Sequence, residues 1–356
     1  MKYWLNTLKA ALLLSGAVMG AGFLSGRELV FFFGTEGFLP FLLIAGGVLF
    51  SGFAAVFAGG GMPAGKAVGR FFQAAFLFAD FVFAASMLAG LNELTVQAGI
   101  LGGTPLLSAG ACVFCFLYSG KGKAGAGVLS AVLMPAALIL INIAVFSGRT
   151  LSYGGAPANP LTGIAGACVF AFMNVFVSVP AVSAGARGLG RKSLYAGAAL
   201  FSLLTAAQAA LILMAVRGAF SADAALPLLS AVKDGAGIAF GSALGLGMLT
   251  SFYTCFCNVA DHTGNLWGKK GVAAAACAAY LCSFIGLGNI VKYLYPVIGV
   301  LGAVYVGMLL YSLCSARIKT AGSGDNNLIL KSAKGRNNHV KKEQKKQSEK
   351  TERQRL

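Results

Sequence analysis

Long apolar segments recur along most of the chain, and short polar or basic segments separate them. A helix needs roughly 20 apolar residues to cross the hydrocarbon core of a bilayer. The pattern therefore predicts an all-α membrane protein whose transmembrane domain covers residues 1–314. Ten apolar segments of suitable length lie at about 10–33, 37–58, 71–98, 104–119, 126–147, 162–186, 193–216, 236–258, 271–286 and 289–314.

The first of these segments is interrupted near its middle. The stretch from Gly16 to Glu28 reads GAVMGAGFLSGRE and contains four glycines. Each glycine destabilises a helix interior by about 1 kcal/mol relative to alanine. Irregular backbone at membrane depth is tolerated only where protein or a water-filled cavity covers it. We therefore predict a discontinuous first helix whose freed backbone groups line a binding site. A small-residue packing face is the alternative, because the glycine spacing also fits GxxxG.

Ten segments divide into two sets of five, and the second set then crosses the membrane in the opposite sense. This is the geometry of an inverted repeat, and it predicts that the sixth segment is broken like the first. Asn174, Ser178 and Pro180 interrupt that segment. Pro180 removes one backbone hydrogen bond and clashes with the preceding turn. An ordinary proline kink is the alternative interpretation.

Basic residues in the short loops predict the orientation of the chain, because Lys and Arg concentrate on the cytoplasmic side. With the N-terminus inside, the cytoplasmic segments carry eleven basic residues and the external loops carry three. We therefore expect both termini in the cytoplasm and a multi-pass protein.

The last 42 residues, 315–356, differ from the rest of the chain in composition. They contain twelve Lys or Arg and four acidic residues, and almost no apolar ones after Leu330. Such a segment cannot bury enough surface to fold, so we predict a disordered basic tail. We expect it to contact anionic lipids. Nucleic acid is not an expected partner, because no aromatic or motif residues accompany the charge.

Residues that carry catalysis or hold metals are sparse. The two histidines, His262 and His339, lie outside the apolar segments, and no nucleophile–base pair is recognisable. We therefore expect no enzyme and no cofactor other than a coupling ion. The phosphate-binding motif GxxxxGK[ST] is absent, so ATP-driven transport is not expected.

The run GAGFLSGRE, together with the ten segments and the basic loops, resembles the YkvI-like bacterial membrane proteins over residues 1–314. More distantly, the layout is similar to the leucine-transporter fold of the amino acid–polyamine–organocation superfamily. Gly20-Ala21-Gly22 stands where that fold unwinds helix one, and Leu249-Thr250-Ser251 stands where it has Leu-Thr-Ser in helix eight. The chain departs from this fold because its tenth segment lacks an acidic residue and its sixth lacks a glycine-rich break. The resemblance implies a secondary transporter in the bacterial inner (plasma) membrane.

Both lines of reasoning predict an ion-coupled secondary transporter of a small polar solute, an amino acid or a similar zwitterion, working by alternating access. The helix that begins after Gly22 directs its positive end toward the break and favours a carboxylate. A non-transporting sensor or structural protein on the same scaffold is the alternative. We expect the substrate to contact the first, third and sixth segments at Ala21, Gly22, Phe23, Ser86, Phe172 and Asn174.

Sodium or a proton is the expected coupling ion. A sodium site is predicted where the break meets the eighth segment, with oxygen ligands from Gly16, Met19, Gly247, Thr250 and Ser251. The hydroxyls of that segment also commonly bond back to their own helix. Asp80 is the candidate proton carrier, because a carboxylate within the membrane is costly and such residues are usually functional. A structural acid held by hydroxyls or a loop lysine is the alternative.

The remaining charged residues of the apolar segments predict gating pairs. We expect Glu28 to pair with Lys292 when the outer vestibule closes, and Arg27 to pair with Glu93. On the inner side, Asp261 is placed to meet Lys2 or Lys9. Ordinary snorkelling of these side chains to the interface is the alternative in every case.

Overall fold

The computed structural model describes residues 2–34, 37–59, 66–147, 160–185, 189–216, 226–231 and 237–315. The chain divides into two compact units after Val306. The site discussed below lies wholly in the first unit. The described part of the second unit, residues 307–315, is helical. The predicted basic tail and its lipid contacts lie outside the described residues, apart from Ser315.

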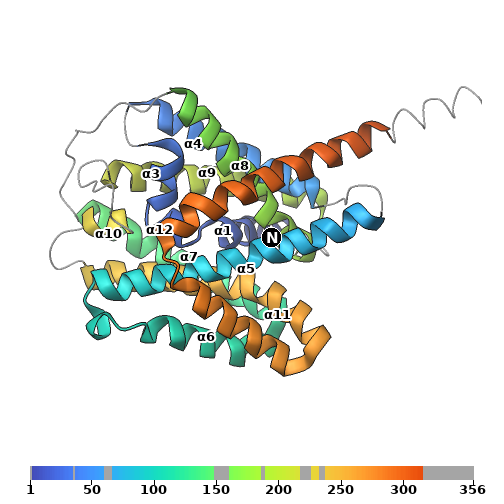
Figure 1. The fold of residues 1–356 in the computed structure, drawn as a ribbon. Coiled ribbons are helices and arrows are strands. Elements are labelled where there is room, and N and C mark those ends of the chain that lie inside the picture. Colours follow the sequence, from blue (N-terminus) through green and yellow to red (C-terminus); the bar gives the residue numbers. More distant parts are fainter. Residues whose placement is uncertain are drawn as a thin grey trace, which may run out of the picture. The chain divides into compact units, whose positions relative to one another are not determined.

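Every regular element in the described ranges is a helix (Figure 1). The α-helices are α1 (Lys2–Val18), α2 (Ala21–Leu24), α3 (Arg27–Phe33), α4 (Leu39–Ala58), α5 (Lys66–Gln97), α6 (Leu106–Tyr118), α7 (Gly122–Ser147), α8 (Pro160–Gly185), α9 (Arg191–Val216), α10 (Pro227–Ala231), α11 (Gly237–Ser283) and α12 (Leu287–Asn289). Short 3₁₀ helices at Ile100–Gly103 and Ser119–Lys121 flank α6, and a π-helical turn, Ile290–Leu294, follows α12.

Six helices of the described chain are long and apolar enough to cross a membrane. This confirms the predicted all-α class and agrees with the predicted membrane location. The six are Leu39–Ala58, Lys66–Gln97, Gly163–Ser183, Arg191–Val216, Phe240–Ser283 and Leu287–Ser315.

Two glycines change the direction of long helical stretches. Gly268 has φ 62° and ψ −151° and interrupts the helical dihedrals of α11. Glycine tolerates this backbone because it has no Cβ. The predicted segments 236–258 and 271–286 therefore lie on opposite sides of this turn, on the two helices that α11 comprises. Gly286, with φ 88°, stands between α11 and α12.

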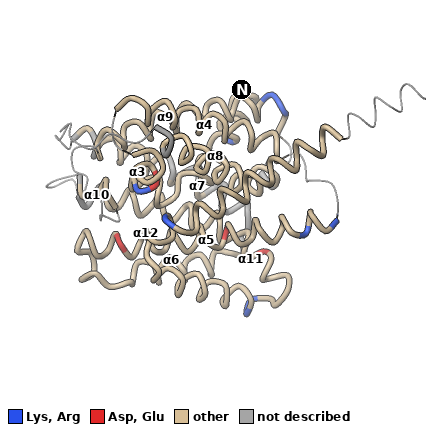
Figure 2. Tube along the Cα trace, turned by 45° about the horizontal axis from the view of Figure 1, so that its top comes forward, with Lys and Arg blue, Asp and Glu red and all other residues tan. Residues whose placement is uncertain are grey.

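The helix α5 runs through the middle of the first unit and packs against α11 (Figure 1). On other faces α5 also contacts α6, α8 and the broken first segment, while α4 packs between α8 and α9. Most of the described chain in Figure 2 is uncharged, and α3 carries both a basic and an acidic residue, Arg27 and Glu28.

The predicted break in the sixth segment is wrong. The helix α8 runs without interruption from Pro160 to Gly185 and contains Pro180 in its interior. One proline removes a single intrahelical hydrogen bond, and a long apolar helix packed on two sides absorbs that loss as a local distortion. The proline-kink alternative describes α8 correctly.

Candidate functional site

The first apolar segment is interrupted twice, at residues 19–20 and again at 25–26. At the first interruption Gly20 is extended, with φ −85° and ψ −172°. The Gly20 amide donates to the Val18 carbonyl at 2.8 Å, and the Ala21 amide donates to the Met87 sulfur at 2.9 Å. The carbonyls of Gly16 and Ala17 therefore lose the amide donors that a continuous helix would supply. The discontinuous first helix that the sequence predicts is confirmed.

Glycine is required at the first interruption because α5 approaches it closely. A Cβ at Gly20 would overlap the terminal methyl group of Met87. The bond from Ala21 to the Met87 sulfur is buried, and both residues are excluded from solvent. The small-residue packing face and the break therefore coincide. Because Gly20 has no side chain, α5 approaches closely enough for the Met87 sulfur to accept a hydrogen bond from the irregular backbone.

The second interruption is a turn at Ser25 and Gly26. Gly26 has φ 82°, a left-handed conformation that glycine adopts without strain. The Ser25 hydroxyl donates to the Gly22 carbonyl at 3.2 Å and accepts from the Arg27 amide at 3.3 Å. The Leu228 amide of α10 donates to the Ser25 carbonyl at 2.9 Å. The four residues of α2 are all buried, so protein covers the irregular backbone on both sides of them.

Glu28 is the least expected residue of the site. Its side chain is only 1% exposed, and neither carboxylate oxygen has a hydrogen-bond partner in the described chain. The carboxyl group lies directly on Gly22, where any Cβ would overlap it. The Phe23 backbone and the Tyr295 hydroxyl are its near polar neighbours, but neither reaches standard hydrogen-bond geometry.

Tyr295 brings the last span into contact with α5. Its hydroxyl lies 2.8 Å from the Ser86 hydroxyl, and its ring stacks on Phe83 with centroids 4.6 Å apart. The Ser86 hydroxyl also lies 2.7 Å from the Phe83 carbonyl. All three side chains are buried. The π-helical turn at 290–294 directly precedes Tyr295. Such turns are rare in proteins, and those that occur are often found at functional sites.

The predicted substrate residues divide into two groups. Ala21, Gly22, Phe23 and Ser86 gather around the break. Phe172 instead packs edge-on against Phe50 at 5.4 Å, and the Phe50 side chain is 43% exposed.

Asn174 is buried on α8, and its amide donates to the Phe170 carbonyl of the same helix at 2.9 Å. Its side-chain oxygen has no hydrogen-bond partner in the described chain. Unlike Phe172, Asn174 therefore keeps a buried acceptor available.

The predicted sodium ligands are brought together in part. The Ser251 hydroxyl of α11 donates to the Met19 carbonyl at 2.9 Å, which joins the eighth segment to the break. The Thr250 hydroxyl instead donates to the Leu246 carbonyl of its own helix at 2.8 Å. Gly247 is covered by Leu24, whose side chain occupies the space of a Cβ. Gly16 lies in the last turn of α1 with its carbonyl freed as described above.

Asp80 has a partner on the neighbouring helix. The carboxylate is 3% exposed, and the Asn258 amide of α11 donates to it at 2.9 Å. Asp80 precedes Ser86 by six residues, about 9 Å along the helix at 1.5 Å per residue. Asp80 therefore stabilises the α5–α11 contact at a distance from the break.

Glu28 and Lys292, which the sequence predicts to pair when the outer vestibule closes, do not form a hydrogen bond in the described structure. Lys292 is exposed, and its ammonium lies 5.2 Å from the centre of the Tyr293 ring. The face of the Tyr293 ring stabilises this charge. The Glu28 carboxyl is buried on Gly22 without a partner, so the two groups occupy different environments.

Arg27 and Glu93, in contrast, lie close enough for electrostatic attraction. Both side chains lie beside the glycines at the start of α12. The Arg27 guanidinium lies 3.4 Å from the Cβ position of Gly288, and the Glu93 carboxyl lies 3.8 Å from that of Gly286. Asp261 and Lys9 are both exposed, on α11 and α1, and the Lys2 side chain is outside the described part.

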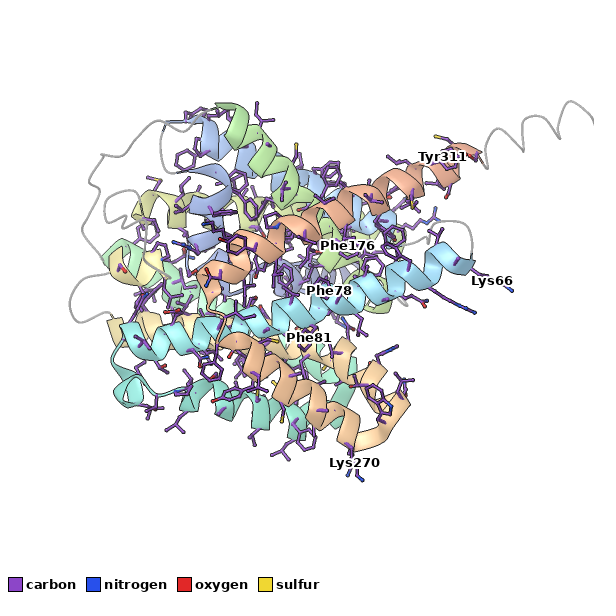
Figure 3. The ribbon with its side chains drawn as sticks, viewed as in Figure 1. Lys66, Phe78, Phe81, Phe176, Lys270 and Tyr311 are labelled. Carbon is purple, nitrogen blue, oxygen red and sulfur yellow. The ribbon has the colours of Figure 1, made fainter. Side chains whose placement is uncertain are left out.

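An aromatic cluster lies near the start of α5, on the opposite side of the break from Arg27 and Glu93. Phe76 and Phe176 have ring centroids 4.3 Å apart, and Tyr305 lies 5.1 Å from Phe76. Figure 3 labels Phe176. Phe72 joins the same cluster, 5.0 Å from Tyr305. Phe76 precedes Ser86 by ten residues, about 15 Å along the helix, while Glu93 follows it by seven, about 10 Å.

Met87 and Tyr295 are the site residues that reasoning from the sequence missed. Both lie within ordinary apolar segments, and no pattern in the sequence distinguishes them. A comparison with models of known protein families gives no match for this chain, and a comparison with curated proteins gives none either.

Proposed function

We propose that this protein is an ion-coupled secondary transporter of a small polar solute, an amino acid or a similar zwitterion, working by alternating access. One observation carries the proposal: the first segment is interrupted twice, and protein covers its freed backbone groups. Irregular backbone of this kind is tolerated in membranes where it forms binding sites for solutes and coupling ions.

Two groups of side chains, one on each side of the break, support alternating access. The aromatic cluster of Phe72, Phe76, Phe176 and Tyr305 lies toward one end of α5. Arg27 and Glu93 lie toward the other end. We infer that these two groups act as gates, so that the conformation described here is closed toward both. Opening one gate at a time would expose the break to one side of the membrane.

The arrangement of the helices also supports a finer proposal for the fold. If α1–α3 count as one broken span and the turn at Gly268 divides α11 into two, the helices make ten transmembrane segments in two sets of five. We propose that these sets form an inverted repeat with both termini in the cytoplasm. The resemblance to the YkvI-like proteins and to the leucine-transporter fold agrees with this count. The repeat is asymmetric in this proposal, because its first segment is broken and α8 is continuous.

Sodium binding between α1 and α11 is part of the proposal. Met19 and Ser251 already meet there, and the carbonyl of Gly16 is free of its helical donor. A sodium ion would replace the hydrogen bond between Ser251 and Met19 and accept oxygen ligands from both residues. The Thr250 hydroxyl would keep its bond to Leu246 and offer a lone pair.

The experiment is uptake by purified protein in proteoliposomes, with a radiolabelled mixture of the twenty standard amino acids. We expect saturable uptake driven by an imposed proton or sodium gradient, and none in protein-free liposomes. Gly22→Ala should lower uptake, because a Cβ at this position overlaps the Glu28 carboxyl. Gly46→Ala on the exposed face of α4 is the matched control, since nothing lies within 4 Å of that position.

Absence of uptake by correctly folded wild-type protein contradicts the proposal. Tight binding of an amino acid without uptake would instead favour a sensor on the same scaffold. Gel filtration of each variant separates loss of transport from loss of folding.

A further inference from the structure

The buried carboxyl group of Glu28 requires a proton or a cation. An ionised carboxylate removed from water is costly unless hydrogen bonds or an opposite charge compensate it. Both oxygens of Glu28 lack hydrogen-bond partners in the described chain, and the side chain is enclosed at the break. The Glu28 carboxyl group is in close contact with Gly22, so no space for a bound ion remains between them. A bound proton removes the charge without needing additional space.

The hydrogen bonds beside Glu28 indicate where its proton would point. Carbonyl groups only accept, so the 2.7 Å contact of Ser86 with the Phe83 carbonyl uses the single Ser86 proton. The 2.8 Å contact between Ser86 and Tyr295 therefore uses the Tyr295 proton. The Tyr295 oxygen is then left to Glu28 as an acceptor only. A protonated Glu28 can donate a hydrogen bond to this oxygen. An ionised Glu28 would instead face the lone pairs of the Tyr295 oxygen, which repel its negative charge.

The charged groups around Glu28 do not replace the proton. Asp80 on α5 accepts from Asn258, and Arg27 is attracted to Glu93. Lys292 is exposed over Tyr293. The helix α4 has no titratable side chain. The other titratable residues on elements packed around α2 and α3 are Lys66 and Arg70 on α5, Cys168 on α8, Arg191, Lys192 and Tyr195 on α9, and, on α11, Tyr253, Cys255, Cys257, Asp261, His262, Lys269, Lys270, Cys277, Tyr280 and Cys282.

We propose that Glu28 is the proton-binding site of this protein, protonated in the conformation described here and ionised when the break opens to water. Its role as a coupling site rests on the proposed transport function, whereas proton binding does not. In each cycle Glu28 takes a proton from water on one side and returns it to water on the other. No other bond is formed or broken.

The position of Glu28 links the proton to the solute. Its carboxyl group lies on Gly22, where the sequence predicts backbone contacts to a substrate. A solute that reaches these backbone groups must displace the carboxyl group. Displacement separates Glu28 from Tyr295 and brings it to water or to the solute, where the ionised form is stable. Solute movement and proton release are therefore coupled at one residue.

Infrared difference spectroscopy of the purified protein tests proton binding without any solute. On titration from neutral to alkaline pH, we expect the wild type to lose a carbonyl band of a protonated carboxylic acid. Glu28→Gln should abolish this band, while Asp80→Asn, which alters another buried carboxyl group, should keep it. A wild type without the band, or a band that survives Glu28→Gln, overturns the proposal.

Two further variants keep Glu28 and test the direction of the hydrogen bonds. Tyr295→Phe removes the acceptor, and Ser86→Ala frees the Tyr295 proton to turn toward Glu28. Both should leave less of the protonated band than wild type at the same pH. A band equal to wild type or larger in Tyr295→Phe overturns the assigned donor order, and with it the proposal. These variants remain informative if Glu28→Gln fails to fold.

A transport measurement tests the coupling separately. With the amino-acid mixture in proteoliposomes, a pH gradient should drive uptake by wild type and by the control variant Gly46→Ala, and not by Glu28→Gln. Proton-driven uptake that survives in Glu28→Gln overturns the coupling role. If no protein takes up any amino acid, the proposed transport function fails, and the infrared band alone decides whether Glu28 binds a proton.

Discussion

The hydroxyl group of Ser251 donates a 2.9 Å hydrogen bond to the carbonyl group of Met19, and both residues are buried. This bond crosses from α11 to the first interruption, between residues far apart in the sequence. It satisfies a carbonyl that the end of α1 leaves without a helical donor. The break is therefore held from two sides, by Ser251 of α11 and by Met87 of α5.

We expect Ser251→Ala to destabilise the protein, because the buried Met19 carbonyl loses its donor. The cost of such an unsatisfied group is about 1–3 kcal/mol. Thermal unfolding in detergent measures it, with Thr250→Val as the control, since the Thr250 hydroxyl bonds within its own helix. Sodium should raise the unfolding temperature of wild type and not of the variant that carries both substitutions. Equal stabilisation of all proteins by sodium and by choline excludes the predicted sodium site.

Gly22→Ala should destabilise the protein through overlap with the Glu28 carboxyl group. Inserting a methyl group into a well-packed interior costs about 1–3 kcal/mol. The same substitution should cost less in a Glu28→Ala background, because the overlapping group is then absent. A double-mutant cycle in thermal unfolding measures this difference. Equal costs in both backgrounds mean that Gly22 and Glu28 are not in contact.

Met87→Leu should destabilise the irregular backbone at Ala21 while nearly preserving side-chain volume. The substitution removes the sulfur that accepts from the Ala21 amide at 2.9 Å. A buried amide without an acceptor costs about 1–3 kcal/mol. Hydrogen exchange at Ala21 should become faster than in wild type. Met248→Leu on α11 is the control, because Met248 is equally buried and lies near Gly90 instead. Unchanged exchange at Ala21 contradicts the role of the sulfur.

Asn258→Ala should destabilise the contact between α5 and α11, because Asp80 loses the amide that donates at 2.9 Å. The expected cost is about 1–3 kcal/mol, measured by thermal unfolding. Asn289→Ala is a matched control with a smaller effect, since Asn289 is exposed and bonds within its own turn. We also expect Asp80→Asn to keep the pH dependence of uptake, in contrast to Glu28→Gln. Loss of that dependence in Asp80→Asn would instead identify Asp80 as the proton carrier.

Arg27 and Glu93 illustrate where charge alone is informative. Both are expensive in a membrane and need compensation, which the sequence already indicates, and the structure brings them near each other. Glu28 and Lys292, by contrast, do not form a hydrogen bond in the described structure. A lysine at the edge of an apolar segment reaches water without a partner, and a carboxyl group becomes neutral by binding a proton.

The sequence by itself determined the class of the protein and the break in its first helix. Length and apolarity of a segment are local properties, and so is the instability that four glycines impose between Gly16 and Gly26. The continuity of α8 was not readable in the same way, because one proline in a long apolar helix is tolerated or not according to the packing around it. Only the tertiary structure decided what surrounds the break. Met87, Ser251 and Tyr295 come from three distant segments, and the helix packing that brings them to Ala21, Met19 and Glu28 depends on contacts across the whole bundle.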